Sequence, residues 1–276
     1  MRVAVIGAGT MGAGIATSCV AAEIDVVLVE RDPARAEIAD EQIRSSLERL
    51  AAKDEALQVD AALARLDRAD DLCDTEGSDL VIEAIPELLD LKREVFAALD
   101  ALHGPEVVLA TNTSSLSVSA IAEGLGRPGR VVGTHFFNPV PVSSLVEIVV
   151  GENTADEAVA RAAALSDRLG KVSIVVQDSP GFASSRLGLA LGLEAIRMLE
   201  QGVASAEDID TAMHLGYRHP MGPLRLTDLV GLDVRLDIAR HLHRTIGDRF
   251  APPDLLAQMV ADGHLGRKTG RGFFEW

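Results

Sequence analysis

The chain has 276 residues, of which 47% are hydrophobic, and a formal net charge of −16 at pH 7. This length suits one large or two ordinary domains with a sizeable core. The negative charge argues against nucleic acid and anionic membrane surfaces, which attract patches of Lys and Arg, but not against an anionic small substrate, which needs only a local positive patch. Cys19 and Cys73 lack metal-site spacing. We expect both to be buried thiols in a reducing compartment, the cytoplasm.

Residues 3–22 carry no charge and follow Arg2, a pattern that also occurs in signal peptides and membrane spans. Four glycines interrupt the run and make it a poor apolar helix. A glycine loop explains them better, so we predict no targeting segment and no membrane span.

The glycines belong to a dinucleotide-binding fingerprint. A β-branched run at 2–6 predicts a strand, the loop Gly-Ala-Gly-Thr-Met-Gly follows at 7–12, a helix is predicted over 11–23, and a second strand over 25–30. The first glycine allows the tight turn, the second lets a pyrophosphate approach the backbone, and the third lets helix and strand pack closely. The helix N-terminus offers N–H groups to phosphates. We therefore expect the following residues to bind NAD: Gly7, Gly9, Thr10, Met11 and Gly12.

Glu30 ends the second strand, eighteen residues after Gly12. A carboxylate there can bind the adenosine ribose hydroxyls and repels a 2′-phosphate, which favours NAD over NADP. Arg31 follows directly and weakens that preference.

Residues 35–64 are charged and rich in Ala and Leu with helical spacing, and they are longer than a crossover helix needs. We predict a helical hairpin projecting from the sheet; the alternative is a solvated amphipathic excursion. Strands are next predicted over 79–85 and 106–111, with a helix over 88–102 between them.

Polar side chains follow the ends of successive predicted strands: Glu87, Asn112, Ser114 and His135. In a doubly wound sheet, ligands bind outside the carboxyl ends of the strands. We therefore expect these side chains to line one cleft.

The stretch 131–149 predicts a strand that ends at His135, a proline-rich turn, and a second strand that carries Glu147. A returning strand can bring the imidazole and the carboxylate within hydrogen-bonding distance. Such a pair is a general base with a carboxylate that fixes its tautomer. The alternative is a His and a Glu in unrelated places.

A helix at 156–169 and a strand at 172–176 complete the first half, and Asp178-Ser-Pro-Gly181 marks a break. We predict a Rossmann-like, doubly wound, mostly parallel α/β domain over 1–180 and an all-helical domain over 181–276. Helices of the second domain are predicted over 182–201, 205–215, 228–246 and 252–262, with 219–223 as an irregular link. The apolar stretch 182–198 favours a homodimer through these helices.

The whole set of motifs resembles the 3-hydroxyacyl-CoA dehydrogenase family in its short, single-function form, which includes 3-hydroxybutyryl-CoA dehydrogenases. The resemblance covers 2–274 and rests on these motifs: GAGTMG, VIEAIPE, ATNTSSL, GTHFFNPVPVSSLVEIV, DSPGF, HPMGPLRLTDLVGLD and GRKTGRGFF. It implies a dimer and the NAD-linked interconversion of L-3-hydroxyacyl and 3-ketoacyl thioesters of CoA, with short acyl chains expected.

By motif match, the resemblance implies that His135 is the general base and Glu147 its partner. It implies that Ser114 contacts the substrate hydroxyl and the nicotinamide. Three further positions match residues that contact NAD in the family: Glu87, Lys92 and Lys268.

Two segments depart from the family pattern. Ser185 stands where the family usually has Asn, so a shorter hydroxyl replaces an amide beside the substrate carbonyl. In the helical hairpin, only Arg49 and Lys53 stand where the family commonly carries a lysine cluster near the CoA phosphates. These departures leave open a related dehydrogenase that acts on a carrier-protein thioester or a free 3-hydroxy acid.

Two other classes of protein share parts of this pattern. One is a catalytically silent NAD-binding protein, against which Ser114, His135 and Glu147 argue. The other is a 6-phosphogluconate-type dehydrogenase, which relies on a catalytic lysine where the segment around Ser185 has none.

Overall fold

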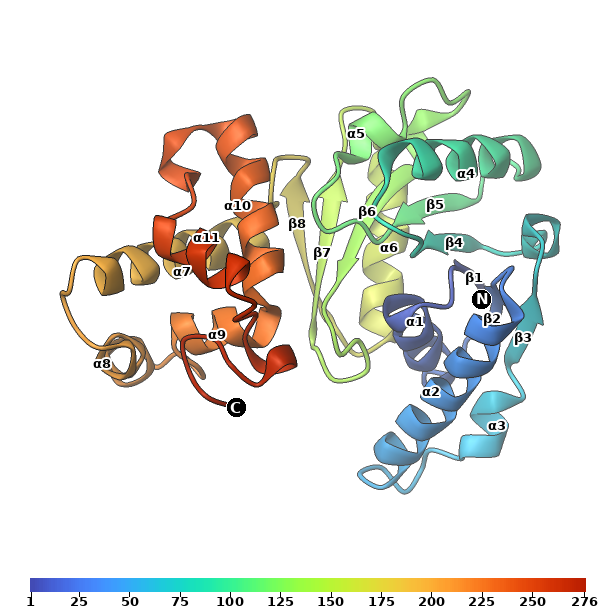
Figure 1. Cartoon of the computed structure of the whole chain (residues 1–276). Helices are drawn as coiled ribbons and strands as arrows, with labels where there is room; N and C mark the ends of the chain where they lie inside the picture. The colour runs from blue at the N-terminus through green and yellow to red at the C-terminus, as the bar shows by residue number, and fades with distance from the viewer. The chain divides into compact units, whose positions relative to one another are not determined.

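The computed structural model describes all residues from 1 to 276 and divides into two compact units, Met1–Ser179 and Pro180–Trp276 (Figure 1). No helix in it combines the length and the apolar composition needed to cross a membrane.

The first unit is built on one eight-stranded sheet with the strand order β3-β2-β1-β4-β5-β6-β7-β8. Neighbouring strands are parallel except β6 and β7, which are antiparallel. This arrangement confirms the predicted doubly wound, mostly parallel sheet. The strands are β1 Arg2–Ile6, β2 Asp25–Val29, β3 Leu66–Ala69, β4 Leu80–Glu83, β5 Val108–Thr111, β6 Val131–Phe136, β7 Leu145–Val150 and β8 Val172–Gln177.

Helices cover both faces of the sheet, which explains why its central strands are continuous apolar runs. One face packs against α1, α2 and α6 in a single core cluster, and α6 is visible behind the sheet in Figure 1. On the other side are α4 and α5, with fully buried Phe96 and Ile121. The helices are α1 Thr10–Ala21, α2 Pro33–Ala51, α3 Val59–Leu63, α4 Leu89–Leu102, α5 Val118–Ile121 and α6 Asp156–Arg168.

The segment predicted as a helical hairpin contains α2 and α3. Asp32 caps α2 by accepting a hydrogen bond from Ala34 N at 3.0 Å, and Pro33 occupies the first helical position. The strand β3, which follows α3, was not predicted. Its sequence, Leu-Asp-Arg-Ala, carries two exposed charges because the strand lies at the edge of the sheet and pairs only with β2.

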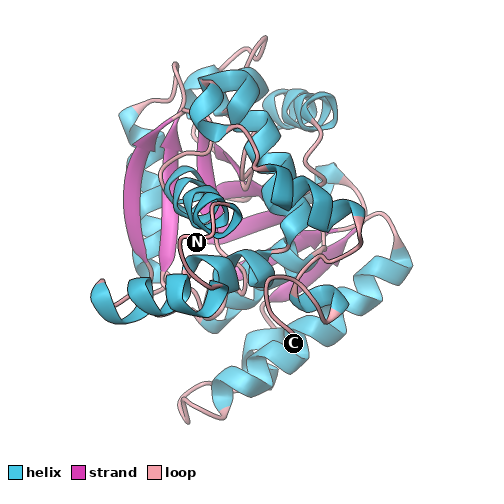
Figure 2. Cartoon of the chain, turned by 60° about the vertical axis from the view of Figure 1, so that its left-hand side comes forward, coloured by secondary structure: helices cyan, strands magenta, loops and turns pink.

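The second unit consists of helices and loops, as the colours of Figure 2 show. Its α-helices are α7 Ser184–Glu200, α8 Ala206–Thr211, α9 Pro223–Val230, α10 Leu232–Ile246 and α11 Asp254–Ala261. The single helix predicted over 228–246 is wrong, because Gly231, with a φ of 107°, separates α9 from α10. The start of α9 at Pro223 is stabilised by the Asp210 carboxylate, which accepts hydrogen bonds from the backbone N–H groups of Leu224 and Arg225, both at 2.8 Å.

The cysteine prediction is correct for one residue and wrong for the other. Cys19 is fully buried in α1, and burial raises the pKa of its thiol to about 12. Cys73 is exposed, because it lies in a short 3₁₀ turn over 72–75 on the surface.

Gly12 and Gly9, which both lie in or next to the loop after β1, have different steric surroundings. Gly7 has a φ of 95°, which favours glycine, and its carbonyl oxygen lies where a side chain at Gly12 would begin. Nothing lies within 4 Å of the place where a side chain at Gly9 would begin. Gly12, where a side chain would clash, and Gly9, where it would not, therefore form a matched pair for mutation.

We expect Gly12→Ala to lower the free energy of unfolding by about 1–3 kcal/mol, because the added methyl group forces the loop and α1 apart. Gly9→Ala, the control, should change it by no more than about 0.5 kcal/mol. Urea denaturation followed by circular dichroism measures both. Equal losses in the two variants would contradict this steric assignment.

Candidate active site

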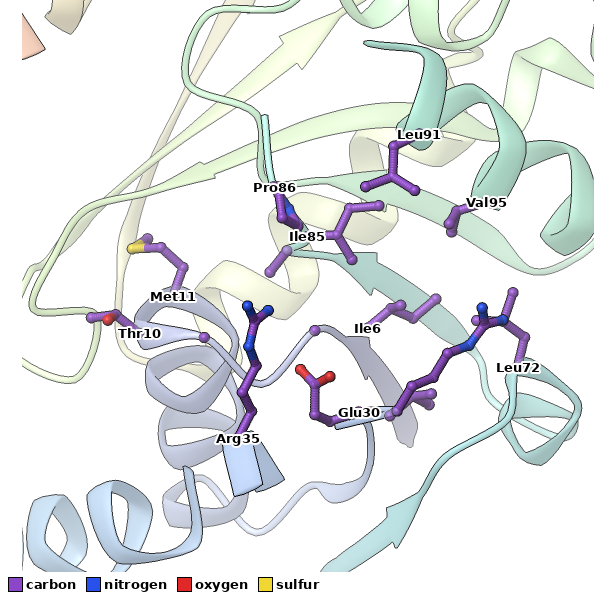
Figure 3. Close-up of a pocket in the computed structure, with 15 residues that line it drawn as sticks. Ile6, Thr10, Met11, Glu30, Arg35, Leu72, Ile85, Pro86, Leu91 and Val95 are labelled. Atoms are coloured by element: carbon purple, nitrogen blue, oxygen red, sulfur yellow. The ribbon is translucent and has the colours of Figure 1, made fainter. Parts of the chain in front are cut away.

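A cleft of about 400 Å³ lies at the carboxyl ends of β1, β2 and β4. Here the strand order reverses, with β2 on one side of β1 and β4 on the other. Figure 3 shows Glu30 on one side of the cleft and the apolar side chains of Ile85, Leu91 and Val95 on the other. The predicted residues Gly7, Gly9, Thr10, Met11 and Glu30 all line it.

The polar groups of this cleft are fixed in place. The Glu30 carboxylate accepts hydrogen bonds from Ala8 N and Asp32 N, both at 3.1 Å, so it is held against the glycine loop. No side chain caps the N-terminus of α1, and Gly9 leaves the approach to it open. An uncapped helix start beside a fixed carboxylate suits a ligand with both phosphates and ribose hydroxyls. Arg31 also lines the cleft, next to Glu30.

A buried ion pair lies behind the cleft. The Lys92 ammonium of α4 donates to Glu83 Oε1 at 2.6 Å and lies 3.2 Å from Glu87 Oε2. The Lys92 and Glu83 side chains are 1% and 0% exposed, so water screens their attraction very little. Thr111 Oγ1 donates to the other Glu83 oxygen at 2.7 Å. Lys92 is therefore bound between two carboxylates.

Glu87 joins this pair to the turn after β5. Its Oε1 accepts hydrogen bonds from Thr113 Oγ1 at 2.6 Å, Ser114 N at 2.9 Å and Ser115 N at 3.1 Å. Burial raises the pKa of Glu87, but the Lys92 charge and these hydrogen bonds outweigh it and hold the pKa below its usual range. The ionised carboxylate thus fixes the backbone that carries Ser114.

His135 and Glu147 face each other across the antiparallel pair β6 and β7. His135 Nδ1 lies 2.7 Å from Glu147 Oε2, and the side chains are 9% and 0% exposed. The Phe137 ring lies against the imidazole, with 4.5 Å between ring centroids. Asn112 Oδ1 accepts a hydrogen bond from Phe136 N at 2.9 Å, which connects the turn after β5 to the end of β6.

A second cleft, of about 360 Å³, lies between α1, α2 and the turn after β6. Arg49 lines it, and its guanidinium donates to Ser45 Oγ at 3.2 Å and Ser46 Oγ at 2.9 Å. Lys53 is exposed just beyond the end of α2 and does not line this cleft.

The remaining predicted residues belong to the second unit. Ser185 lies in the first turn of α7, where it is half-buried. Lys268 forms an ion pair with Asp233 of α10, with its Nζ 2.6 Å from Oδ1.

Sequence reasoning missed Glu83, whose only signal is an acid at the end of an otherwise apolar strand, Leu-Val-Ile-Glu. A fully buried carboxylate requires a partner, and the basic residue nine positions later, Lys92, supplies it.

Comparison with known proteins agrees with this fold and identifies the family. Residues 2–179 match the model of the 3-hydroxyacyl-CoA dehydrogenase NAD binding domain, and residues 181–276 match that of the 3-hydroxyacyl-CoA dehydrogenase C-terminal domain. The chain is 41% identical to a probable 3-hydroxybutyryl-CoA dehydrogenase of Bacillus subtilis, over all of this chain and 97% of the relative. It is 43% identical to a 3-hydroxybutyryl-CoA dehydrogenase of Mycobacterium tuberculosis, over all of this chain and 98% of the relative.

Among solved structures, the (S)-3-hydroxybutyryl-CoA dehydrogenase of Ralstonia eutropha superimposes with a TM-score of 0.94 at 42% identity, covering all of this chain and 98% of that one. The chain belongs to the 3-hydroxyacyl-CoA dehydrogenase family. It is an NAD-dependent oxidoreductase, as the resemblance predicted. The cleft with the glycine loop and Glu30 fits NAD.

The buried ion pair leads to a stability prediction. We expect Lys92→Met to lower the free energy of unfolding by about 3–5 kcal/mol, because it leaves the Glu83 carboxylate buried without a counter-ion. The double variant Glu83→Gln with Lys92→Met should recover part of this loss. Urea denaturation at pH 7 measures all variants.

The control for Lys92→Met is Arg65→Met, which breaks an exposed ion pair with Asp25 of 2.8 Å. Exposed pairs contribute about 0–1 kcal/mol, so this variant should remain close to the parent. A Lys92→Met loss as small as that of the control would refute the assigned role of Lys92.

Glu87 leads to a pH prediction. Its pKa is lower in the folded chain than in the unfolded one, so its stabilising contribution is fully present above the ordinary carboxyl pKa of about 4.3 and is lost as the pH falls through the folded pKa. The stability difference between the parent and Glu87→Gln should therefore be largest at pH 6–7 and shrink in acid. Urea denaturation between pH 7 and pH 3.5 tests this, and a difference that grows in acid would contradict it.

Proposed function

We propose that the protein interconverts L-3-hydroxyacyl-CoA and 3-ketoacyl-CoA, with the four-carbon pair 3-hydroxybutyryl-CoA and acetoacetyl-CoA among its substrates, and that His135 is the general base. The observation that supports this most is the 2.7 Å contact between His135 Nδ1 and Glu147 Oε2, made by two buried side chains that face each other across β6 and β7. The relatives named above carry the same activity in their names.

In oxidation, the C3 hydroxyl loses its proton to His135 as the C3 hydride is transferred. NAD, when bound, supplies the hydride acceptor. The Nδ1 atom faces Glu147, so Nε2 is the nitrogen that we assign to the substrate proton. The ionised Glu147 holds the Nδ1–H tautomer and stabilises the imidazolium that forms. Reduction runs the same steps in reverse: C3 receives the hydride and its oxygen takes the proton from His135.

Ser114 is proposed to position the substrate hydroxyl and the nicotinamide end of NAD. Its backbone N–H is fixed by Glu87, which is in turn held by Lys92. We therefore assign Glu87 and Lys92 to the support of this turn as well as to NAD. Ser185 is proposed to donate to the substrate carbonyl, and Lys268 to contact NAD.

The CoA part of the substrate is assigned to the second cleft. Arg49 is a cation there, and two serine hydroxyls orient it. With Lys53 outside the lining, the positive charge available to phosphates is small. This is the observation that favours the alternative, a carrier-protein thioester or a free 3-hydroxy acid. Saturation by acetoacetyl-CoA at micromolar concentration would decide against that alternative.

We further propose that the protein acts in the cytoplasm as a homodimer formed through the second unit. Support comes from α7, where Leu187 and Leu191 are 66% and 45% exposed in the single chain. A monomer in sedimentation at micromolar concentration would contradict this.

We expect His135→Ala to lower kcat for acetoacetyl-CoA reduction by about 10²- to 10⁴-fold, the usual contribution of a general acid or base. Glu147→Gln should lower kcat by up to about 10⁴-fold, because an amide no longer enforces the tautomer. NADH oxidation at 340 nm measures both variants.

NADH binding, measured by fluorescence titration, is the control for these variants and should stay within about threefold of the parent. Activity that survives unchanged in His135→Ala would show that another group moves the proton.

A further inference from the structure

Lys171, which lies between α6 and β8, is a buried cation that binds main-chain oxygen atoms instead of a carboxylate. It is 6% exposed, and its ammonium donates to Val140 O and Ser143 O, both at 2.6 Å. Burial lowers the pKa of this ammonium. A buried cation carries a desolvation cost that an apolar side chain of similar volume does not. Stability alone therefore does not explain a lysine here, and its two acceptors indicate its role.

Both acceptors belong to the turn over 137–144, which joins β6 to β7 and is called the β6–β7 turn below. Its two prolines have no N–H group to donate. Two N–H groups of the turn donate to the same acceptor, Pro139 O, at 2.9 and 3.0 Å. Lys171 supplies the donors for the carbonyl groups of Val140 and Ser143, and so fixes the middle and the end of the turn.

A second contact holds the β6–β7 turn against α1. The Val140 side chain is 1% exposed, and its Cβ and Cγ2 atoms lie 3.0 Å from the place where a side chain at Gly14 would begin. Pro141 Cδ lies 3.6 Å from the same place. A larger residue at Gly14 would push the turn away from the helix. Lys171 and Gly14 together therefore determine where the turn lies.

The β6–β7 turn forms a wall of the second cleft, to which the CoA part of the substrate is assigned. Residues 138–141 line this cleft together with Gly14 and Arg49. We propose that Lys171 is a positioning residue for the CoA part of the substrate, because it holds the turn that shapes the cleft. This inference rests on the proposed function. His135 and Glu147 depend less on Lys171, because the pairing of β6 with β7 sets their register.

Lys171→Met, which removes the donors and keeps the length of the side chain, tests this with two thioesters of one acyl group. We expect kcat/KM for acetoacetyl-CoA to fall about 10-fold, the range of one or two lost hydrogen bonds, through KM and with kcat within about threefold. Acetoacetyl-N-acetylcysteamine has no nucleotide to place in the second cleft, so its kcat/KM should stay within about twofold of the parent. NADH oxidation at 340 nm measures both.

Arg130→Met is the matched control. Arg130 is also a buried cation, 6% exposed, that donates to main-chain oxygen atoms, Asp100 O at 2.9 Å and His103 O at 3.2 Å. It lies before the amino end of β6 and lines neither cleft. This variant should keep kcat/KM for both thioesters within about twofold of the parent. All assays are run below the midpoint of thermal unfolding of the least stable variant.

Two further variants keep the test open if Lys171→Met does not fold. Lys171→Gln keeps one donor on a shorter side chain and should retain part of the kcat/KM for acetoacetyl-CoA. Gly14→Ala displaces the same turn through its contact with Val140 and should show a loss confined to the CoA thioester.

Equal losses with the two thioesters, or no loss with either, would overturn this inference and leave the proposed function standing, because the parent still reduces acetoacetyl-CoA. A CoA-specific loss of the same size in Arg130→Met would also overturn it, since loosening of the whole unit would then be the cause. NADH binding by the parent without turnover of acetoacetyl-CoA would overturn both the inference and the proposed function.

Discussion

The buried Lys92 ammonium is the interaction on which the geometry of the candidate site depends. It lies between Glu83, at the end of a central strand, and Glu87, in the connection to α4. The Lys92 and Glu83 side chains are 1% and 0% exposed, so leaving either of them without the other would cost several kcal/mol. The three groups therefore fix one another, and with them the junction of the strand and the helix.

This constraint extends to the proposed catalytic pair through ordinary hydrogen bonds. Glu87 holds the backbone at Ser114, and Asn112, two residues earlier, accepts from Phe136 N, the residue after His135. Each step is a short, directional contact between neighbouring strand ends. The doubly wound topology supplies this proximity, because it gathers the carboxyl ends of the strands at one edge. Placement of the proposed base is thus a property of the sheet edge rather than of a single loop.

What the sequence predicts well are features with local physical requirements. A glycine loop between a strand and a helix can be predicted without tertiary information. The pairing of His135 with Glu147 can be predicted as well, because the short, proline-rich turn between their strands forces the second strand to run back beside the first. The start of α9 at Pro223 and the edge strand β3 were missed, since both depend on partners distant in sequence: the Asp210 cap for the helix start and the pairing with β2 for a charged strand. The role of Glu83 was invisible for the same reason.

Lys92 and Arg235 pose the same physical problem and differ in its solution. Lys92 is satisfied within the chain by two carboxylates, so its charge contributes to a rigid site. Arg235 of α10 is 6% exposed, its Nε has no hydrogen-bond partner, and no ion pair with a carboxylate compensates its charge, so this charge lowers the stability of the chain. A buried cation therefore stabilises or destabilises the fold according to whether a carboxylate lies within reach of it.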